Sequence, residues 1–537
     1  MIWSEGQIPE GGQPFSPLLT SDLLSYGVAL FRLGLELRSQ ERHSIAAINA
    51  FERAGEAIES VVRDGNPEFN ERGFYTVLAA AAYHLGHFSA RAFSLFPSEL
   101  ESLNLSPAER SLTLLMRRDL SGVRGMLLTY AGENGFDETL GAELSRIEDA
   151  DGGALDHGVF LTLNSLYHKA LAIFDYALES GSENALQAAL AMLDEGTAAA
   201  EEYVSVPFWW LFTLTRHLLD DLWDQSLHVR LPESPDDAPE SQWADLRRLF
   251  IAKLGKQNRA EIEIWPSQLE AAARALDMSD DLVAALPTSA GKTRIAEIAI
   301  LRALALGKRV VFVTPLRALS AQTERSLRQT FTALGFSVSS LYGSSGTTGD
   351  DADSLRNRNI VVTTPEKLDF ALRNDSSLLD DVGLVVFDEA HTIGAGEREI
   401  RYEVLVQRLL RREDADGRRI VCLSAILPQG EQLQDFLAWM RQDQPGHAIT
   451  VNWRPTRQRF GEIYWRENKA LTAKGDLSKN VARLEFRLED VGDDAPYVDG
   501  FVVGQPPRGR QTKPLPRDRR DLCLMSTWRL VGSSLIW

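Results

Sequence analysis

The chain has 537 residues, of which 44% are hydrophobic and 25% are charged, and its formal net charge is −19. This length exceeds what one ordinary hydrophobic core holds, so we expect several domains, and the composition excludes a chain that is mostly disordered. The acidic balance opposes nonspecific attraction to phosphate backbones, so any nucleic-acid surface must be local.

Neither a membrane span nor a secretion signal is expected. The first residues, Met-Ile-Trp-Ser-Glu-Gly, have no basic flank that leads into an apolar core, and charges break the apolar stretches elsewhere. Cys422 and Cys523 lie far apart without metal-ligand spacing, which favours a reducing compartment. We therefore expect a cytoplasmic protein that makes no membrane contact.

The first part of the chain, residues 1–230, is expected to form an all-helical domain. Between about residues 21 and 227, Ala- and Leu-rich segments with helical periodicity alternate with short breaks. The expected helices include 23–37, 43–62, 74–96, 158–178 and 184–203. Residues 80–92 resemble a tetratricopeptide-like helix turn with Gly86 at the bend, but no regular period supports an array. A bundle is therefore favoured over a repeat array, and both stay open.

The composition changes after residue 230. Residues 231–242 are rich in proline and acidic side chains, which predicts a surface linker. From 243 to 465, after an amphipathic helix, short β-rich runs alternate with helices, which predicts a buried parallel sheet of βαβ units. The predicted strands are 282–286, 309–313, 337–342, 359–363, 383–387 and 419–423. The expected fold class is an all-helical domain followed by an α/β domain.

The most specific motif follows the first of these strands. The run Leu-Pro-Thr-Ser-Ala-Gly-Lys-Thr ends at Thr293 and opens a helix-like segment, as a phosphate-binding loop does. Backbone N–H groups of such a loop converge on a phosphate, the Lys292 ammonium neutralises phosphate charge, and the Thr293 hydroxyl can bind Mg²⁺. The predicted nucleotide-binding residues of the loop are Thr288, Ser289, Ala290, Gly291, Lys292 and Thr293.

Two carboxylates follow another apolar strand. Asp388 and Glu389 come just past its end, where the first can hold Mg²⁺ and the second can orient an attacking water. In isolation Lys292 could be a surface lysine and the two acids a solvated turn, but their joint placement after predicted strands favours a nucleotide site. We assign Lys292, Asp388 and Glu389 to catalysis, and Thr293 and Asp388 to the metal.

Six elements in this order resemble the superfamily 2 DEAD/DEAH-box helicases, which are built on RecA-like domains. The segment Trp-Pro-Ser-Gln that ends at Gln268 is similar to their adenine-reading Q element. The others are 286–293 for motif I, 314–319 for motif Ia, 363–367 for motif Ib, 388–391 for motif II and 423–428 for motif III. The resemblance runs from about 265 to 464, and it implies a RecA-like P-loop domain, ATP and Mg²⁺ as cofactors, and Gln268 at the adenine edge.

The resemblance also implies contacts to a nucleic-acid strand. In the family, motifs Ia and Ib grip the sugar-phosphate backbone, which assigns Thr314, Arg317, Thr364 and Lys367 as contacts. These residues follow strand ends, where donors can reach phosphates without reading sequence. No 2′-hydroxyl reader is evident, so DNA and RNA are not distinguished.

Coupling between hydrolysis and strand movement is assigned, by the same resemblance, to His391 and Ser424. Both would lie between the γ-phosphate and the nucleic-acid edge. Ile426 stands where the family has a threonine, which removes one hydroxyl from this link. The prediction that hydrolysis is coupled to strand movement therefore rests on fewer residues than the prediction of ATP binding.

A motor of this family needs a second RecA-like lobe, whose arginines stabilise the transferring phosphoryl group. The sequence after Pro428 lacks the Gln-x-x-Gly-Arg-x-x-Arg pattern of that lobe. Residues 466–537 are predicted to be a connector and an incomplete start of the lobe, with a helix over 521–530 and a strand over 534–537. We expect a truncated chain, or else a separate polypeptide that completes the cleft. The chain alone should bind ATP weakly, hydrolyse it slowly and unwind duplexes poorly.

The favoured function is an ATP-dependent nucleic-acid helicase or translocase that binds DNA or RNA through its backbone. Its helical domain would contact a protein partner or the substrate. The alternative, from another class, is an ATP-gated protein-interaction switch without unwinding activity. Duplex unwinding by a chain with a complete second lobe, compared with its Lys292→Ala variant, separates the two.

Overall fold

The computed structural model describes residues 15–42, 44–64, 71–97, 99–147, 154–235, 240–287, 290–341, 356–390, 396–425 and 430–451, and four short strands between 463 and 536. The chain divides into two compact units. One consists of residues 1–116 with 456–537, and the other of residues 117–455.

The first unit contains helices that pack as neighbours along the chain. They are α1 (Pro17–Gln40), α2 (Ile45–Asp64), α3 (Arg72–Leu85), α4 (Ser89–Ser94) and α5 (Pro107–Met116). The helix expected over 74–96 is wrong as a single element, because α3 ends before Gly86 and the chain bends there, as the sequence indicated. The side chain of Ser16 accepts a hydrogen bond from the Leu19 N–H at 3.2 Å and caps the start of α1.

Helix α1 is apolar and lies close to α2. Gly27 and Gly34 face Ile58 and Phe51, so that a Cβ at either glycine would press on those side chains. The rings of Phe31 and Phe51 meet edge to face at 5.3 Å. Of the described helices, α1 alone has the length and apolar composition that crossing a membrane would require, a test that core helices of soluble proteins also pass.

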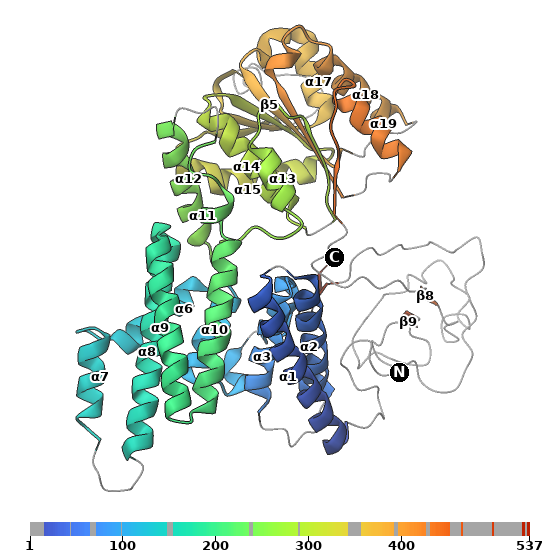
Figure 1. Ribbon diagram of the computed structural model, residues 1–537. Helices are drawn as coiled ribbons and strands as arrows, with labels where there is room; N and C mark the ends of the chain where they lie inside the picture. The colour runs from blue at the N-terminus through green and yellow to red at the C-terminus, as the bar shows by residue number, and fades with distance from the viewer. Residues whose placement is uncertain are drawn as a thin grey trace, which may run out of the picture. The chain divides into compact units, whose positions relative to one another are not determined.

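The second unit begins with another helical segment. Its helices are α6 (Leu120–Ala131), α7 (Phe136–Leu144), α8 (Ala154–Ser180), α9 (Glu183–Glu202), α10 (Val206–Asp224) and α11 (Leu227–Arg230). Helices α8, α9 and α10 run side by side (Figure 1). Gly196 of α9 lies against the ring of Phe212 on α10, and the buried hydroxyls of Tyr167 and Thr215 hydrogen-bond at 2.8 Å. The Ala- and Leu-rich sequence predicted helices over 158–178 and 184–203, and α8 and α9 confirm them.

A parallel sheet forms the centre of the α/β part. Within the described residues, seven strands pair in the order β3-β4-β2-β5-β6-β1-β7, and every pairing is parallel. The strands are β1 (Leu282–Ala285), β2 (Arg309–Val313), β3 (Val338–Leu341), β4 (Ile360–Thr363), β5 (Val382–Asp388), β6 (Arg419–Ser424) and β7 (Ile449–Thr450). The six strands predicted from apolar runs are confirmed, and β7 was not predicted.

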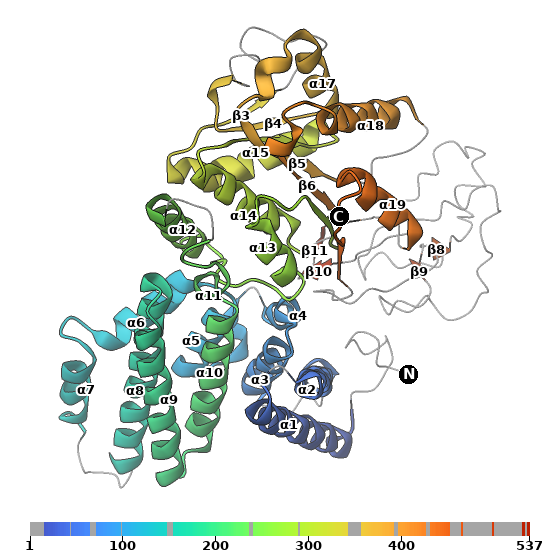
Figure 2. The same cartoon turned by 45° about the horizontal axis from the view of Figure 1, so that its top comes forward.

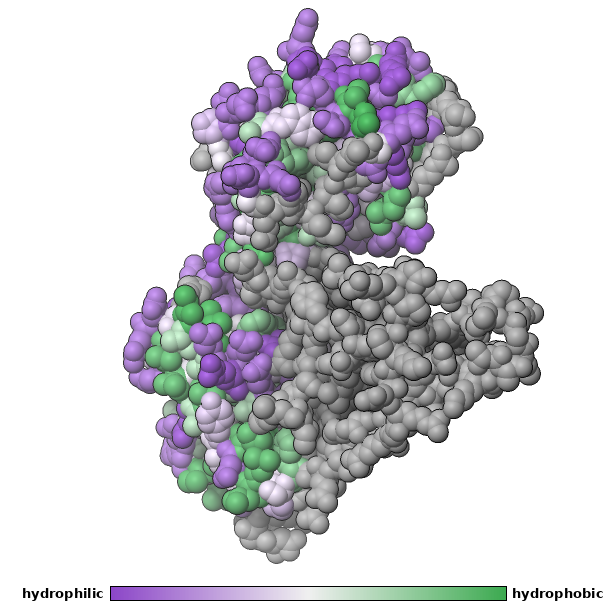
Figure 3. All heavy atoms as spheres, turned by 90° about the vertical axis from the view of Figure 1, so that its right-hand side faces the viewer, coloured by the Kyte–Doolittle hydropathy of each residue, from purple (hydrophilic) through white to green (hydrophobic). Residues whose placement is uncertain are grey.

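Helices cover both faces of this sheet (Figure 2). One face packs against α12 (Glu240–Gly255), α13 (Leu269–Ala275), α14 (Lys292–Ala305) and α15 (Arg317–Phe331), and the other against α17 (Pro365–Asn374), α18 (Glu397–Leu410) and α19 (Glu431–Met440). Burial on both faces explains why the strands are continuous apolar runs. On the face drawn in Figure 3, hydrophilic residues cover most of the described surface around the sheet. The fold is a helical region followed by a RecA-like parallel-sheet domain.

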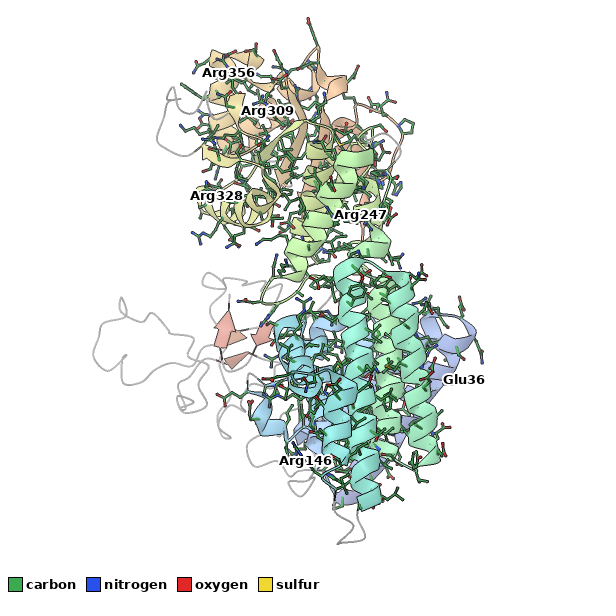
Figure 4. All side chains as sticks on the ribbon, turned by 90° about the vertical axis from the view of Figure 1, so that its left-hand side faces the viewer. Glu36, Arg146, Arg247, Arg309, Arg328 and Arg356 are labelled. Carbon is green, nitrogen blue, oxygen red and sulfur yellow. The ribbon has the colours of Figure 1, made fainter. Side chains whose placement is uncertain are left out.

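The segment that joins the helices to the sheet is partly buried. Leu231 and Trp243 are fully buried in the core beside the sheet, and the Trp243 indole donates to the Pro232 carbonyl at 2.8 Å. Arg247 of α12 (Figure 4) donates to the carbonyls of Leu231 at 2.8 Å and His228 at 2.6 Å. The ends of the expected 231–242 linker are therefore anchored, and its centre, 236–239, lies outside the described residues.

The last part of the chain is described only as short strands. Arg529–Val531 pairs antiparallel with Ser534–Ile536, and Ile463–Tyr464 pairs with Tyr497–Val498. The helix expected over 521–530 is thus wrong at its carboxyl end, because Arg529 and Leu530 lie in a strand instead. The remainder of the predicted connector lies outside the described residues.

Candidate nucleotide site

The phosphate-binding loop joins β1 to α14. Leu286 is fully buried and its N–H donates to the Ser424 carbonyl at 2.9 Å, which fixes the start of the loop beside β6. Gly291 has φ +84° and caps α14, so the first helical residue is Lys292. Only glycine takes this left-handed conformation without strain. Thr288 and Ser289 lie outside the described residues.

The structure brings the loop lysine and the acidic pair together. Lys292 Nζ lies 2.8 Å from Glu389 Oε1, and both side chains are partly buried. Glu389 has φ +51°, and its N–H donates to the Asp388 carboxylate at 3.0 Å. A non-glycine residue with positive φ is uncommon and costs free energy, which suggests that the chain holds this carboxylate in place for a functional reason.

Strand β6 lies between β1, which leads into the phosphate loop, and β5, which leads into the acidic pair. It pairs with β1 on one side and β5 on the other, and the Ala390 N–H donates to its Leu423 carbonyl at 3.1 Å. Ser424 ends the strand and is fully buried between the loop and the acidic turn. This position fits the predicted coupling role of Ser424, which stays a prediction. His391 lies outside the described residues.

Tyr402 of α18 packs below the acidic turn, with its ring edge to face on Phe387 at 5.7 Å. Burial, followed by the nearby Cys422 and Asp388, raises the pKa of the Tyr402 phenol well above its usual value. Burial also raises the pKa of the Cys422 thiol. Both groups therefore stay protonated, and Asp388 lies at the edge of an uncharged, well-packed core.

Gln268 does not present a free amide in this structure. Its Oε1 accepts from the Trp265 N–H at 2.8 Å, and its Nε2 donates to the Gly291 carbonyl at 3.1 Å. The residue is 4% exposed. Adenine recognition by Gln268 stays a prediction, and the geometry shows a second role, which is to tie the Q element to the phosphate loop.

The residues present fit a nucleotide with Mg²⁺. Thr293 is exposed in the first turn of α14, and Asp388 is partly exposed at the end of β5. Among the described residues no group of three or more His, Cys, Asp or Glu side chains could hold a metal. Mg²⁺ commonly binds one or two protein oxygens and takes its other ligands from phosphate and water, so a hydroxyl and one carboxylate suffice.

The predicted nucleic-acid contacts follow neighbouring strands. Thr314 comes after β2 and Thr364 after β4, and the Thr314 N–H donates to the Thr363 carbonyl at 2.9 Å. Thr314, Thr364 and Lys367 are all buried, and the Thr314 hydroxyl hydrogen-bonds Ser320. Nothing is described for the Arg317 side chain. The backbone thus lies at the expected edge, and the strand-contact roles of these four residues stay predictions.

Two residues near the site were missed by sequence reasoning. Ser267 is buried, and its Oγ donates to the Ala290 carbonyl at 3.2 Å, next to the Gln268 contact. Arg398 of α18 pairs with Glu366 at 2.7 Å and also contacts the Pro315 carbonyl, so it links the motif Ia and Ib segments. Ser267 lay within the Q element and could have been considered, whereas no local pattern marks Arg398.

Comparison with known proteins identifies the α/β domain. Residues 265–436 match the model of the DEAD/DEAH box helicase family. This sheet domain is therefore a superfamily 2 DEAD/DEAH box helicase domain with a RecA-like fold, as the motifs predicted.

Relatives extend this picture. The chain is 28% identical over 389 residues to the Hachiman protein HamB of Bacillus cereus, covering 70% of this chain and 33% of that protein. It is 30% identical over 213 residues to the ATP-dependent DNA helicase Hel308 of Thermococcus kodakarensis, covering 38% of this chain and 18% of the helicase. Among solved structures, the DUF1998 helicase MrfA bound to DNA and AMPPNP aligns with a TM-score of 0.33 at 21% identity, covering 41% of this chain and 30% of MrfA. The chain thus spans about a third or less of the curated relatives described here.

Proposed function

We propose that this chain is the ATP-binding part of an ATP-dependent nucleic-acid helicase or translocase. The observation that carries the proposal is the 2.8 Å contact between Lys292 and Glu389, made at the tips of strands in a DEAD/DEAH box domain. Parallel α/β sheets bind their ligands at this carboxyl edge. Two motifs that are far apart in the sequence therefore contact each other, and their charges suit a triphosphate and Mg²⁺.

In the proposed mechanism, Lys292 exchanges one anionic partner for another. When nucleotide occupies the loop, the Lys292 ammonium turns from Glu389 to the phosphate oxygens. The Glu389 carboxylate then becomes available to orient a water molecule and accept a proton from it. Asp388 and Thr293 would hold Mg²⁺, which supplies charge neutralisation at the phosphates. We assign the coupling role to Ser424, because it lies on β6, the strand between β1 and β5.

DNA is the proposed nucleic acid. The support is that Hel308, a relative, is described as a DNA helicase. The helical region would serve substrate or partner contacts, and the cytoplasmic location expected from the cysteines is part of this proposal. The switch without unwinding activity has no specific observation in its favour.

The test separates binding from chemistry. Lys292→Ala should weaken ATP binding at least about tenfold because it removes the charged phosphate partner. Glu389→Gln should bind ATP at least as tightly as the unmodified chain, because the carboxylate that competes for Lys292 is removed, but it should lose hydrolysis. Lys256→Ala, at an exposed lysine after α12, is the matched control and should change neither.

ATP affinity is measured by calorimetry and hydrolysis by phosphate release, with and without single-stranded DNA. If Lys292→Ala hydrolyses ATP at the unmodified rate, the proposed site is wrong. If ATP binds but a chain with a complete second lobe unwinds duplex DNA no better than its Lys292→Ala variant, the nucleic-acid motor is wrong and the interaction switch gains support.

A further inference from the structure

Residues 260–264, which precede the Q element, are held by the helical segment α6–α11 of the unit 117–455. The Leu227 N–H donates to the Ile262 carbonyl at 2.9 Å, and the Ile264 N–H donates to the Gln225 carbonyl at 2.7 Å. Glu263 thus forms an antiparallel bridge with Ser226, in the turn between α10 and α11. Helix α11 lies between α10 and α13 in both ribbon views (Figures 1 and 2).

A buried ion pair fixes the same segment to Arg118, which lies in the turn before α6. One guanidinium nitrogen of Arg118, Nη2, lies 2.7 Å from both carboxylate oxygens of Glu263. The two side chains are only 11% and 7% exposed. The Arg118 carbonyl also accepts from the Ala260 N–H at 2.8 Å, and Arg118 has φ +60°. A strained backbone that persists in this way is over-determined by its contacts.

These contacts lead directly to the phosphate loop. Glu263 is followed closely by Trp265, whose N–H is bound by the Gln268 side chain. The other end of the Gln268 amide holds the Gly291 carbonyl, and Ser267 holds the neighbouring carbonyl. Hydrogen bonds, together with the backbone from Glu263 to Trp265, therefore connect Arg118 to Gly291, the residue before Lys292.

We propose that Arg118 and Glu263 are positioning residues for the nucleotide site. By fixing residues 260–264 they hold the Q element, and through Gln268 they keep the Gly291 backbone in the conformation that receives a phosphate. This inference rests on the proposed function, because it requires the loop to bind a nucleotide. It also gives the helical segment a defined route by which contacts made there alter nucleotide affinity.

The test measures binding of fluorescent MANT-ADP, with Mg²⁺, to the full chain. Glu263→Gln keeps the shape of the side chain and removes its charge, and Arg118→Met removes the guanidinium. Each should raise the dissociation constant about tenfold, as expected when a buried charge-assisted hydrogen bond no longer orders the loop. The exchanged pair Arg118→Glu with Glu263→Arg should recover part of the affinity.

The matched control is Arg124→Met. Arg124 lies on α6, the helix that follows Arg118, and pairs with Asp175 of α8 at 2.8 Å, so its replacement loosens the helical segment at another place. Its dissociation constant should equal that of the unmodified chain. Amide hydrogen exchange, followed on the peptide that covers 286–294, should speed up in the Arg118 and Glu263 variants and not in the control.

The outcomes are distinct. If the unmodified chain binds MANT-ADP and all variants bind it equally, the positioning role is overturned and the nucleotide site stands. If Arg124→Met weakens binding as much as Arg118→Met, general loosening explains the effect and the positioning role is also overturned. If the unmodified chain does not bind the nucleotide at all, the proposed function itself fails.

Discussion

Gly291→Ala tests whether the phosphate loop and the Q element act as one structure. Alanine at φ +84° costs about 1–2 kcal/mol of backbone strain, as left-handed conformations do for L-residues with a Cβ. The new Cβ also collides with the Gln268 amide, so the hydrogen bond to the Gly291 carbonyl is lost at about 1 kcal/mol. Together these give about 2–3 kcal/mol. Since about 1.4 kcal/mol is tenfold in affinity, ATP should bind about 30- to 140-fold more weakly.

The cost appears in binding because the loop must adopt the left-handed conformation when its N–H groups converge on a phosphate. Isothermal titration of ATP into the variant measures it. Gly307→Ala is the matched control, because Gly307 has φ +70° at the other end of α14 and open space around its Cβ. It should lower thermal stability and leave ATP affinity unchanged. An affinity of Gly291→Ala within threefold of the unmodified chain would refute the reasoning.

Two further predictions concern the helical segment. Gly196→Ala should lower the free energy of unfolding by about 1–3 kcal/mol, because the new Cβ meets the Phe212 ring. Gly125→Ala should raise it by about 0.5–1 kcal/mol, because the new Cβ meets nothing and alanine favours a helix over glycine. Thermal melting compares the two variants. Burial lowers the pKa of His168 to about 4, so the unfolded chain binds more protons below pH 6.5 and stability should fall by about 3 kcal/mol between pH 6.5 and 4. Urea unfolding at several pH values checks this, and His168→Gln should show a shallower decline; an equal decline in both would place the titrating group elsewhere.

Much of the fold could be predicted because its signals are local. Strands buried on both faces must be apolar throughout, and six such runs appear in the sequence at the right places. Strand β7, Ile449–Thr450, is too short to leave a pattern. The break at Gly86 was visible as a glycine, but its effect of ending one helix and starting another depends on how α3 and α4 pack.

The site was predicted in part. A loop glycine, a lysine and two acids after strands indicate a phosphate pocket from spacing alone, and the structure joins Lys292 to Glu389 across 97 positions of sequence. The pairing of Arg118 with Glu263 spans 145 positions and has no local signature, because many acids and arginines in this chain could have paired. Gln268 was assigned to adenine from its motif, and only the structure shows that its amide is bound to the loop.

The Lys292–Glu389 pair does not itself lock the pocket. Its side chains are 15% and 27% exposed, and pairs that keep solvent contact are commonly worth about 1 kcal/mol or less, so breaking this one costs a nucleotide no more than about fivefold in affinity. A triphosphate brings several charges against one carboxylate and displaces it readily. What the nucleotide cannot supply is the backbone conformation of the loop, and this is set by the buried amide of Gln268 and the hydroxyl of Ser267. In the proposed nucleotide site, the ion pair therefore keeps Lys292 beside the loop until phosphate arrives, while the Q element determines how well the loop receives it.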